Sequence, residues 1–297
     1  MSRLAVTPGS SGAFQLIFAA LIDPGDEVLL TDPGYPCNAN FVRLFNGRPR
    51  LIACDAESGY QLTARAIEDA WGASTKAVLL GTPSNPTGTV VPPGEMTRIA
   101  ATVERLGGTL IVDEIYHGLT YDANVRTALY DSDDVFIVNS FSKYYGMTGW
   151  RLGWLVMPSA YLDHITKLAQ NLFICTNTPA QYAALRAFDE DVIAELERRR
   201  NVFKQRRDYL VPALRELGFV VPLLPQGAFY VYADCSAFTG DSYAFALDVL
   251  ASTGVAITPG RDFGEYRHRE HLRFSYANTL ENLEIAMERL ANYLRAM

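Results

Sequence analysis

The sequence predicts an α/β fold in which a mostly parallel β-sheet lies between helices and is followed by a smaller C-terminal α/β domain. Short apolar runs rich in β-branched residues alternate with helical patterns at residues 28–30, 77–80, 110–112, 135–138 and 154–156. Strands that are buried on both faces read as continuous apolar runs, which is typical of parallel sheets covered by helices. A long amphipathic pattern then separates this part from the last third of the chain.

The first element is a loop rich in glycine and serine, between a short expected strand and an apolar helix that ends ahead of Pro24. It reads Val-Thr-Pro-Gly-Ser-Ser-Gly-Ala over residues 6–13. Glycine lets the backbone approach an anion, and the free N–H groups and dipole of a helix N-terminus favour phosphate. On this loop alone, a plain helix N-cap at Ser10 or Ser11 is an equally good interpretation.

A single long helix is expected from Asp191 to Leu217, and Gly218 is expected to end it. Beyond it, strands are expected at residues 220–221, 229–232, 255–257 and 272–275, with helices near 243–252 and 280–295. We therefore predict a large domain of residues 1–190, a linking helix of residues 191–218 and a small domain of residues 219–297. The helix is predicted from one apolar stripe, formed by Ile193, Leu196, Phe203, Leu210, Leu214 and Leu217.

Composition argues against several classes of function. The 297 residues carry a net charge of −7 and contain no basic run interleaved with aromatic residues, so a nucleic-acid partner is not expected. No apolar stretch approaches the roughly 18 residues that span a bilayer, and no signal-peptide pattern is visible, so no membrane association is expected. The four cysteines are scattered without zinc-ligand spacing, which predicts reduced thiols, no metal and a cytoplasmic protein.

A second segment with chemical potential, residues 139–153, directly follows the strand at 135–138. Lys143 lies there at the carboxyl end of a strand, where such sheets bind ligands and where an amine can attack a carbonyl. Arg151, Ser140 and Ser142 could hold a phosphate nearby. A lone loop lysine is usually just solvated, so the interpretation depends on its neighbours.

These neighbours carry a resemblance to a known family. Ser140-x-x-Lys143 followed by Gly149-x-Arg151-x-Gly153 resembles the cofactor-lysine signature of the class I and II aminotransferases. Three further motifs resemble that family in its order: Thr-Pro-Ser-Asn-Pro-Thr-Gly at 82–88, Ile-Val-Asp-Glu-Ile-Tyr at 111–116 and Leu-Arg-Phe-Ser at 272–275. The likeness spans about residues 6–294, and it implies fold type I of the enzymes that use pyridoxal 5′-phosphate.

The resemblance implies a role for each matching residue. Lys143 would hold the cofactor as an imine and, once released, act as the base. Asp113 would keep the pyridine nitrogen protonated, while Asn85 and Tyr116 would hydrogen-bond the ring oxygen O3′. The other implied cofactor contacts are the stacking ring of Tyr35 and the phosphate-binding side chains Ser10, Ser11, Ser140, Ser142 and Arg151.

The implied substrate contacts are Arg273 and Asn85. Arg273 resembles the arginine that binds the substrate α-carboxylate through a planar two-point contact, which lysine could not make. Without the family pattern, Arg273 would read as an exposed residue at a strand edge and Asp113 as a helix cap.

The implied function is an aminotransferase that moves an amino group between an amino acid and a 2-oxo acid, as a homodimer. Two alternatives stay open: a lyase of the β-elimination type with the same cofactor, and a catalytically impaired, effector-binding module such as the aminotransferase-like half of some transcription regulators. In the family a further N-terminal segment precedes the glycine-serine loop. Because this sequence starts almost at that loop, the segment is expected to be absent.

Overall fold

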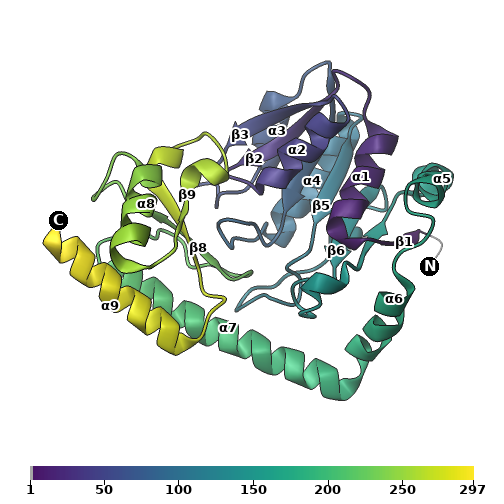
Figure 1. Ribbon diagram of the computed structural model, residues 1–297. Coiled ribbons are helices and arrows are strands. Elements are labelled where there is room, and N and C mark those ends of the chain that lie inside the picture. The colour runs from purple at the N-terminus through teal and green to yellow at the C-terminus, as the bar shows by residue number, and fades with distance from the viewer. Residues whose placement is uncertain (1–2) are drawn as a thin grey trace.

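A seven-stranded sheet forms the centre of the first part of the chain in the computed structural model, which describes residues 3–297 (Figure 1). The order is β1-β7-β6-β5-β4-β2-β3, in which β2 to β6 pair in parallel and β7 is antiparallel to both of its neighbours. The predicted mostly parallel sheet is therefore confirmed. Its strands are β1 (Leu4–Thr7), β2 (Glu27–Asp32), β3 (Arg48–Ala53), β4 (Thr75–Gly81), β5 (Thr109–Asp113), β6 (Val135–Ser140) and β7 (Gly153–Val156).

Helices cover both faces of this sheet, which explains the apolar runs. Helices α1 (Gly9–Leu21), α2 (Pro36–Leu44) and α5 (Leu162–Leu172) pack on one face, and α3 (Ala64–Ala70) and α4 (Pro93–Arg105) on the other. Successive strand residues point to opposite faces. Ile111 thus enters the core under α1, whereas its neighbour Val112 enters the core under α3 and α4.

The second part of the chain is built on a three-stranded antiparallel sheet of order β8-β10-β9, with β8 (Tyr230–Asp234), β9 (Thr258–Pro259) and β10 (His271–Ser275). Helices α8 (Ser242–Thr253) and α9 (Leu280–Ala296) pack with it. Short 3₁₀ helices lie at Ala128–Tyr130, Thr148–Trp150, Ser159–Tyr161, Arg186–Phe188, Gly260–Asp262 and His268–Glu270.

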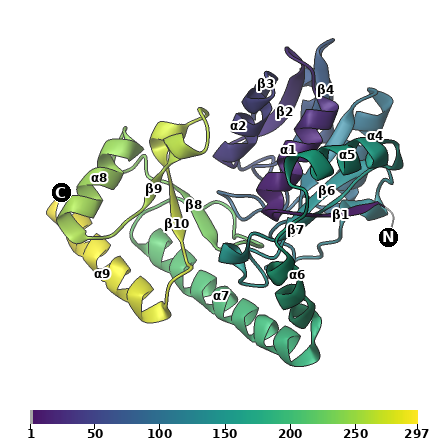
Figure 2. The same ribbon diagram turned by 45° about the vertical axis from the view of Figure 1, so that its right-hand side comes forward.

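The long helix predicted for residues 191–217 is confirmed as α7 (Glu190–Glu216), which follows α6 (Thr178–Leu185) and runs from the large sheet to the small one (Figure 2). Its C-terminal half belongs to the core of the small sheet through Leu210 and Leu214. The apolar stripe does not stay buried throughout, because Ile193 near the N-terminus of α7 is 40% exposed.

Two strand predictions need correction, and one strand was not predicted. Val220 makes an isolated bridge to Asp234 and begins no strand, and residues 255–257 are a loop, with the strand following at Thr258. Strand β3 was not predicted, because it lies at the edge of the sheet and alternates polar and half-exposed residues such as Arg48 and Arg50. Short or edge strands bury too little apolar surface to give a clear periodic signal.

The strand directions bring several chain segments to one edge. Strands β2, β4, β5 and β6 end there, and the end of β1 at Thr7 joins them because Thr7 pairs with Gly153, which pairs with Ser140 at the end of β6. Loops at the carboxyl ends of parallel strands are where ligands bind in such sheets. Among residues 3–297, no helix is long and apolar enough to cross a membrane, and no group of His, Cys, Asp or Glu side chains is arranged to bind a metal ion.

Candidate functional site

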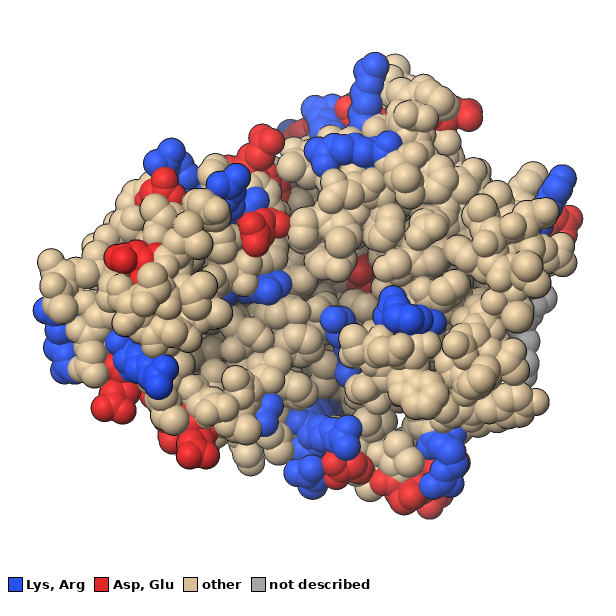
Figure 3. Space-filling model, in the orientation of Figure 1, with Lys and Arg blue, Asp and Glu red and all other residues tan. Residues whose placement is uncertain are grey.

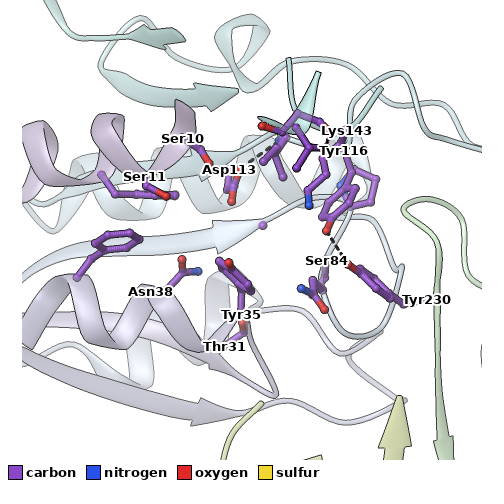
Figure 4. A pocket seen from close by; sticks show the side chains of 18 of the residues that line it. Ser10, Ser11, Thr31, Tyr35, Asn38, Ser84, Asp113, Tyr116, Lys143 and Tyr230 are labelled. Atoms are coloured by element: carbon purple, nitrogen blue, oxygen red, sulfur yellow. Dashed lines mark hydrogen bonds between the residues drawn. The ribbon is translucent and has the colours of Figure 1, made fainter. Parts of the chain in front are cut away.

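A cavity of about 280 Å³ lies between the carboxyl edge of the large sheet and the small sheet. Figure 3 shows a hollow between the two parts of the molecule, with positively charged side chains on its walls. The predicted site residues that line the cavity are Ser10, Ser11, Tyr35, Asn85, Asp113, Tyr116, Ser142, Lys143, Arg151 and Arg273 (Figure 4). Ser140 is the one predicted site residue that does not line the cavity.

Lys143 and Asp113 lie on adjacent strand ends, because β5 and β6 pair in register up to Asp113 and Val138. Burial lowers the pKa of the Lys143 amine, while the charge of Asp113 opposes that change. Burial also raises the pKa of Asp113 to about 7, although its Oδ1 accepts the backbone N–H of Ile115 at 3.1 Å. The two groups therefore form a partly desolvated pair in which burial disfavours both charges, and the Asp113 carboxyl can gain or lose a proton near neutral pH.

The ring of Tyr116 lies beside the lysine. Lys143 Nζ is 5.8 Å from the centre of that ring and 5.8 Å from the centre of the Phe229 ring. The Tyr116 hydroxyl donates to the Tyr230 hydroxyl at 3.2 Å. The side of the cavity around the amine is thus largely aromatic, which accounts for its desolvation.

An anion-binding corner lies at the N-terminus of α1. Pro8 precedes this helix, and no side chain caps its first N–H groups. The Arg151 guanidinium is packed against Gly9, since a Cβ added to Gly9 would lie 2.5 Å from Arg151 Nη2. Arg151 Nη1 also lies 3.5 Å from Ser142 Oγ. Free N–H groups, the helix dipole and a fixed cation together favour a phosphate here.

Ser140 lies behind Ser142 rather than on the cavity wall. Its Oγ is 2.9 Å from both Ser142 Oγ and the carbonyl oxygen of Leu152, and it accepts the Ser142 N–H at 3.1 Å. Ser140 is only 1% exposed. Its hydroxyl therefore fixes the position of Ser142, which is the serine of this pair that faces the cavity.

Arg273 faces the cavity from the small sheet. Its guanidinium group is held by a hydrogen bond and by two aromatic rings. Its Nη1 donates to Asn85 Oδ1 at 3.0 Å, and its guanidinium carbon lies 4.2 Å from the Tyr230 ring centre and 4.7 Å from the Phe263 ring centre. Its Nε is buried and has no partner within residues 3–297. A planar cation held in this way presents a fork that suits a carboxylate.

Among the lining residues that the sequence did not single out are two with polar groups that face the cavity, Asn38 and Tyr230. Asn38 lies in the first turn of α2, and its buried Oδ1 lacks a partner among the described residues. Tyr35 is the extended residue directly before α2, and the Asn38 N–H donates to its carbonyl oxygen at 3.0 Å, so the two residues lie close together. Tyr230 begins β8, within the strand predicted at residues 229–232.

Comparisons with known proteins agree with this geometry. Residues 1–290 match the sequence model of the family described as aminotransferase class I and II. The valine–pyruvate aminotransferase of Mycobacterium tuberculosis is 40% identical over 293 residues, which cover 98% of this chain and 75% of that protein. The crystal structure of an aminotransferase from Mycobacterium tuberculosis superposes with a TM-score of 0.97 at 39% identity and covers 100% of this chain and 77% of its own. Aspartate aminotransferase from Thermus thermophilus with maleate gives a TM-score of 0.93 at 32% identity, over 98% and 76% of the two chains.

Proposed function

The chain belongs to the class I and II aminotransferase family, and on that premise we propose that it binds pyridoxal 5′-phosphate at Lys143. The chain is an aminotransferase, an enzyme that moves an amino group between an amino acid and a 2-oxo acid. The observation that carries the proposal is that the Lys143 amine, the buried Asp113 carboxyl and an uncapped helix N-terminus share one cavity.

The donor set fits this cofactor. The N-terminus of α1, Ser142 and Arg151 supply N–H, hydroxyl and guanidinium groups for the phosphate, with Ser10 and Ser11 beside them and Ser140 behind Ser142. When bound, the cofactor supplies an electron-withdrawing ring that stabilises negative charge at the substrate Cα.

The other polar groups of the cavity fit the ring and the substrate. Asp113 would hold the proton on the ring nitrogen, and Tyr116 and Asn85 would hydrogen-bond the ring oxygen, with Tyr35 against the ring face. Arg273 would bind the substrate carboxylate, since its Nε still lacks a partner within the described residues. Lys143 Nζ, whose pKa burial lowers, would take the proton from the substrate Cα.

The proposal is tested with the purified chain, pyridoxal 5′-phosphate, a panel of amino acids as donors and a 2-oxo acid as acceptor. Valine and pyruvate are the first pair, because a relative is a valine–pyruvate aminotransferase. The wild-type protein should show visible absorbance from the bound cofactor, and an amino acid should abolish it. Lys143→Ala should lose that absorbance and at least about 10²-fold in rate, the lower end of what a positioned base contributes.

Lys167→Ala, on the exposed surface of α5, is the matched control and should behave like wild type. If a folded Lys143→Ala protein kept both absorbance and rate, the assignment of the lysine would be wrong.

We also propose that two copies assemble through one apolar side of the molecule. Strand β1, helices α5 and α6 and the start of α7 lie together there in Figures 1 and 2. Ile174 is 85% exposed with a φ of 62°, an unusual conformation for a β-branched residue. A patch of this kind commonly marks an interface. Its large exposed side chains are Leu4, Val6, Leu172, Ile174, Tyr182, Leu185, Phe188 and Ile193.

We further propose that the domain boundaries fall at residues 190 and 218 and that the protein is cytoplasmic. Ala187 packs with the large sheet's lysine loop, whereas Leu210 and Leu214 pack with the small sheet, which supports a linking role for the helix between them. The four cysteines are free thiols among the described residues, which supports a reducing compartment.

A further inference from the structure

Tyr144 follows Lys143 in the chain but leaves the cavity and joins two other segments. Its hydroxyl donates to Glu197 Oε1 of α7 at 2.6 Å. Its ring is packed on Gly118, because a Cβ added to Gly118 would lie 2.5 Å from Tyr144 Cγ. Gly118 comes two residues after Tyr116, so Tyr144 connects the lysine loop, the Tyr116 segment and helix α7.

A second series of contacts also links α7 to the Lys143 amine. Phe203 of α7 stacks on Phe229, with ring centres 5.6 Å apart and an angle of 25° between the planes. Phe229 in turn packs edge-on against Tyr116 at 5.6 Å and lies 5.8 Å from Lys143 Nζ. Glu197 and Phe203 therefore link one helix to Lys143 by two separate paths.

The hydrogen bond between Tyr144 and Glu197 is a strong link between the lysine loop and helix α7. A short O–H···O⁻ bond to a carboxylate is stronger than a neutral hydrogen bond. Glu197 Oε2 is bound at 2.7 Å by Arg200, one turn further along α7, so each oxygen of the Glu197 carboxyl has a partner that fixes it. Burial raises the pKa of Tyr144, and Glu197 adds to this effect, so the hydroxyl stays protonated and remains the donor.

Helix α7 is also part of the core of the small sheet through Leu210, Val211 and Leu214. A displacement of the small sheet against the large one must therefore move α7. We propose that Tyr144 and Glu197 are positioning residues that transmit the position of the small sheet, through α7, to the Lys143 amine. This proposal concerns the position of the Lys143 amine. It rests on the proposed function, in which that amine binds the cofactor and acts as the base.

The first test measures the Lys143 amine without any cofactor. The cofactor-free protein is labelled with acetic anhydride over a range of pH, and the labelled lysines are quantified by mass spectrometry, with the exposed Lys167 as internal reference. Tyr144→Phe and Glu197→Ala should each raise the labelling midpoint of Lys143 by at least about half a pH unit. The reason is that a released amine becomes more hydrated, and burial is what lowers its pKa.

The matched control is Tyr145→Phe, which removes a hydroxyl that has no hydrogen-bond partner among residues 3–297, and it should leave the midpoint unchanged. Glu197→Gln, whose amide oxygen can still accept from Tyr144, should return the midpoint most of the way to the wild-type value. The double variant Tyr144→Phe/Glu197→Ala should shift it no further than the larger single shift, because both changes remove the same contact.

The inference is overturned if Tyr144→Phe and Glu197→Ala leave the Lys143 midpoint where Tyr145→Phe leaves it, even if their thermal stability falls. The visible absorbance of bound pyridoxal 5′-phosphate, titrated against pH, gives a second readout that should shift in the same variants. A wild-type protein without that absorbance would contradict the proposed function, but the labelling result would still decide the inference.

Discussion

At the scale of single residues, the site is a set of charges kept from water. Asp113 is 8% exposed, and Lys143 is partly buried beside it. Each group would be strongly hydrated on its own, and burial disfavours the charged form of both. Their mutual attraction offsets part of this cost, as the opposing effects on the pKa of Lys143 indicate. A bound ligand with complementary charges would offset the rest of the free-energy cost of burying these two charges.

Asp113→Asn should change how the stability of the cofactor-free protein depends on pH. The folded-state pKa of Asp113 is about 7, above its ordinary value of 3.8, so its contribution to stability is complete below about pH 4 and is lost as pH rises through 7. The asparagine variant has no such loss. The wild-type free energy of unfolding, relative to the variant, should therefore fall by at least about 1 kcal/mol between pH 5 and pH 8.

Urea unfolding of both proteins at these two pH values checks this prediction. Asp23→Asn, which removes an exposed carboxyl, should show no comparable pH-dependent difference. An identical pH dependence for wild type and Asp113→Asn would show that Asp113 is ionised at its ordinary pKa.

At the scale of elements, the N-terminus of α1 decides where an anion can bind. The helix begins at Gly9 with a φ of 70°, a left-handed conformation that glycine adopts without strain. The same glycine leaves room for Arg151 to pack against the first turn. The alternative interpretation of this loop was a helix N-cap at Ser10 or Ser11. No side chain caps α1, so that interpretation does not hold. The first-turn N–H groups therefore remain free for a ligand.

Gly9→Ala should weaken the binding of pyridoxal 5′-phosphate. The added Cβ would displace Arg151, and the left-handed backbone would cost about 1–2 kcal/mol in an alanine. The dissociation constant, measured by titrating the visible absorbance, should rise by at least about tenfold. Gly94→Ala, in the first turn of α4, is the matched control because a Cβ there meets only the end of Arg98 at 3.9 Å. Equal affinities for the two variants would contradict the anion-binding role of α1.

At the scale of the whole molecule, the cavity lies between two sheets that α7 connects, and one side of the large sheet exposes many apolar side chains. The small sheet supplies Arg273 and Tyr230, while the large sheet supplies the lysine and the anion corner. The relative position of the two sheets therefore sets the distance between the groups proposed for the substrate carboxylate and for the phosphate.

Ile174→Glu should weaken self-association. The wild-type chain should sediment at about twice its 32.9 kDa mass. A buried unpaired charge in an apolar interface is costly, so the variant should sediment closer to the monomer mass at the same concentration. Leu247→Glu, on α8 at the far side of the molecule in Figure 1, is the control and should sediment like wild type. A monomeric wild-type protein would reject the proposed interface.

The amino-acid sequence alone predicts the large sheet, the long helix and half of the cavity-lining residues. Lys143, Asp113 and Asn85 sit in short motifs directly after apolar strands, and residues at the carboxyl ends of neighbouring parallel strands must lie at one edge. The apolar strands are local in the chain, so periodicity is enough to predict them, whereas the roles of the residues that follow them were implied by the resemblance to the family's motifs.

Which side chains contact one another depends on how the elements pack in three dimensions. Arg273 contacts Asn85 across 188 positions, and Tyr144 contacts Glu197 across 53. Ser140, predicted beside the phosphate, lies one layer behind the cavity. Such contacts depend on strand order, on domain packing and on which rotamer the surrounding atoms permit. A periodic pattern records which face of an element is buried, but it carries no information about the partner that covers that face.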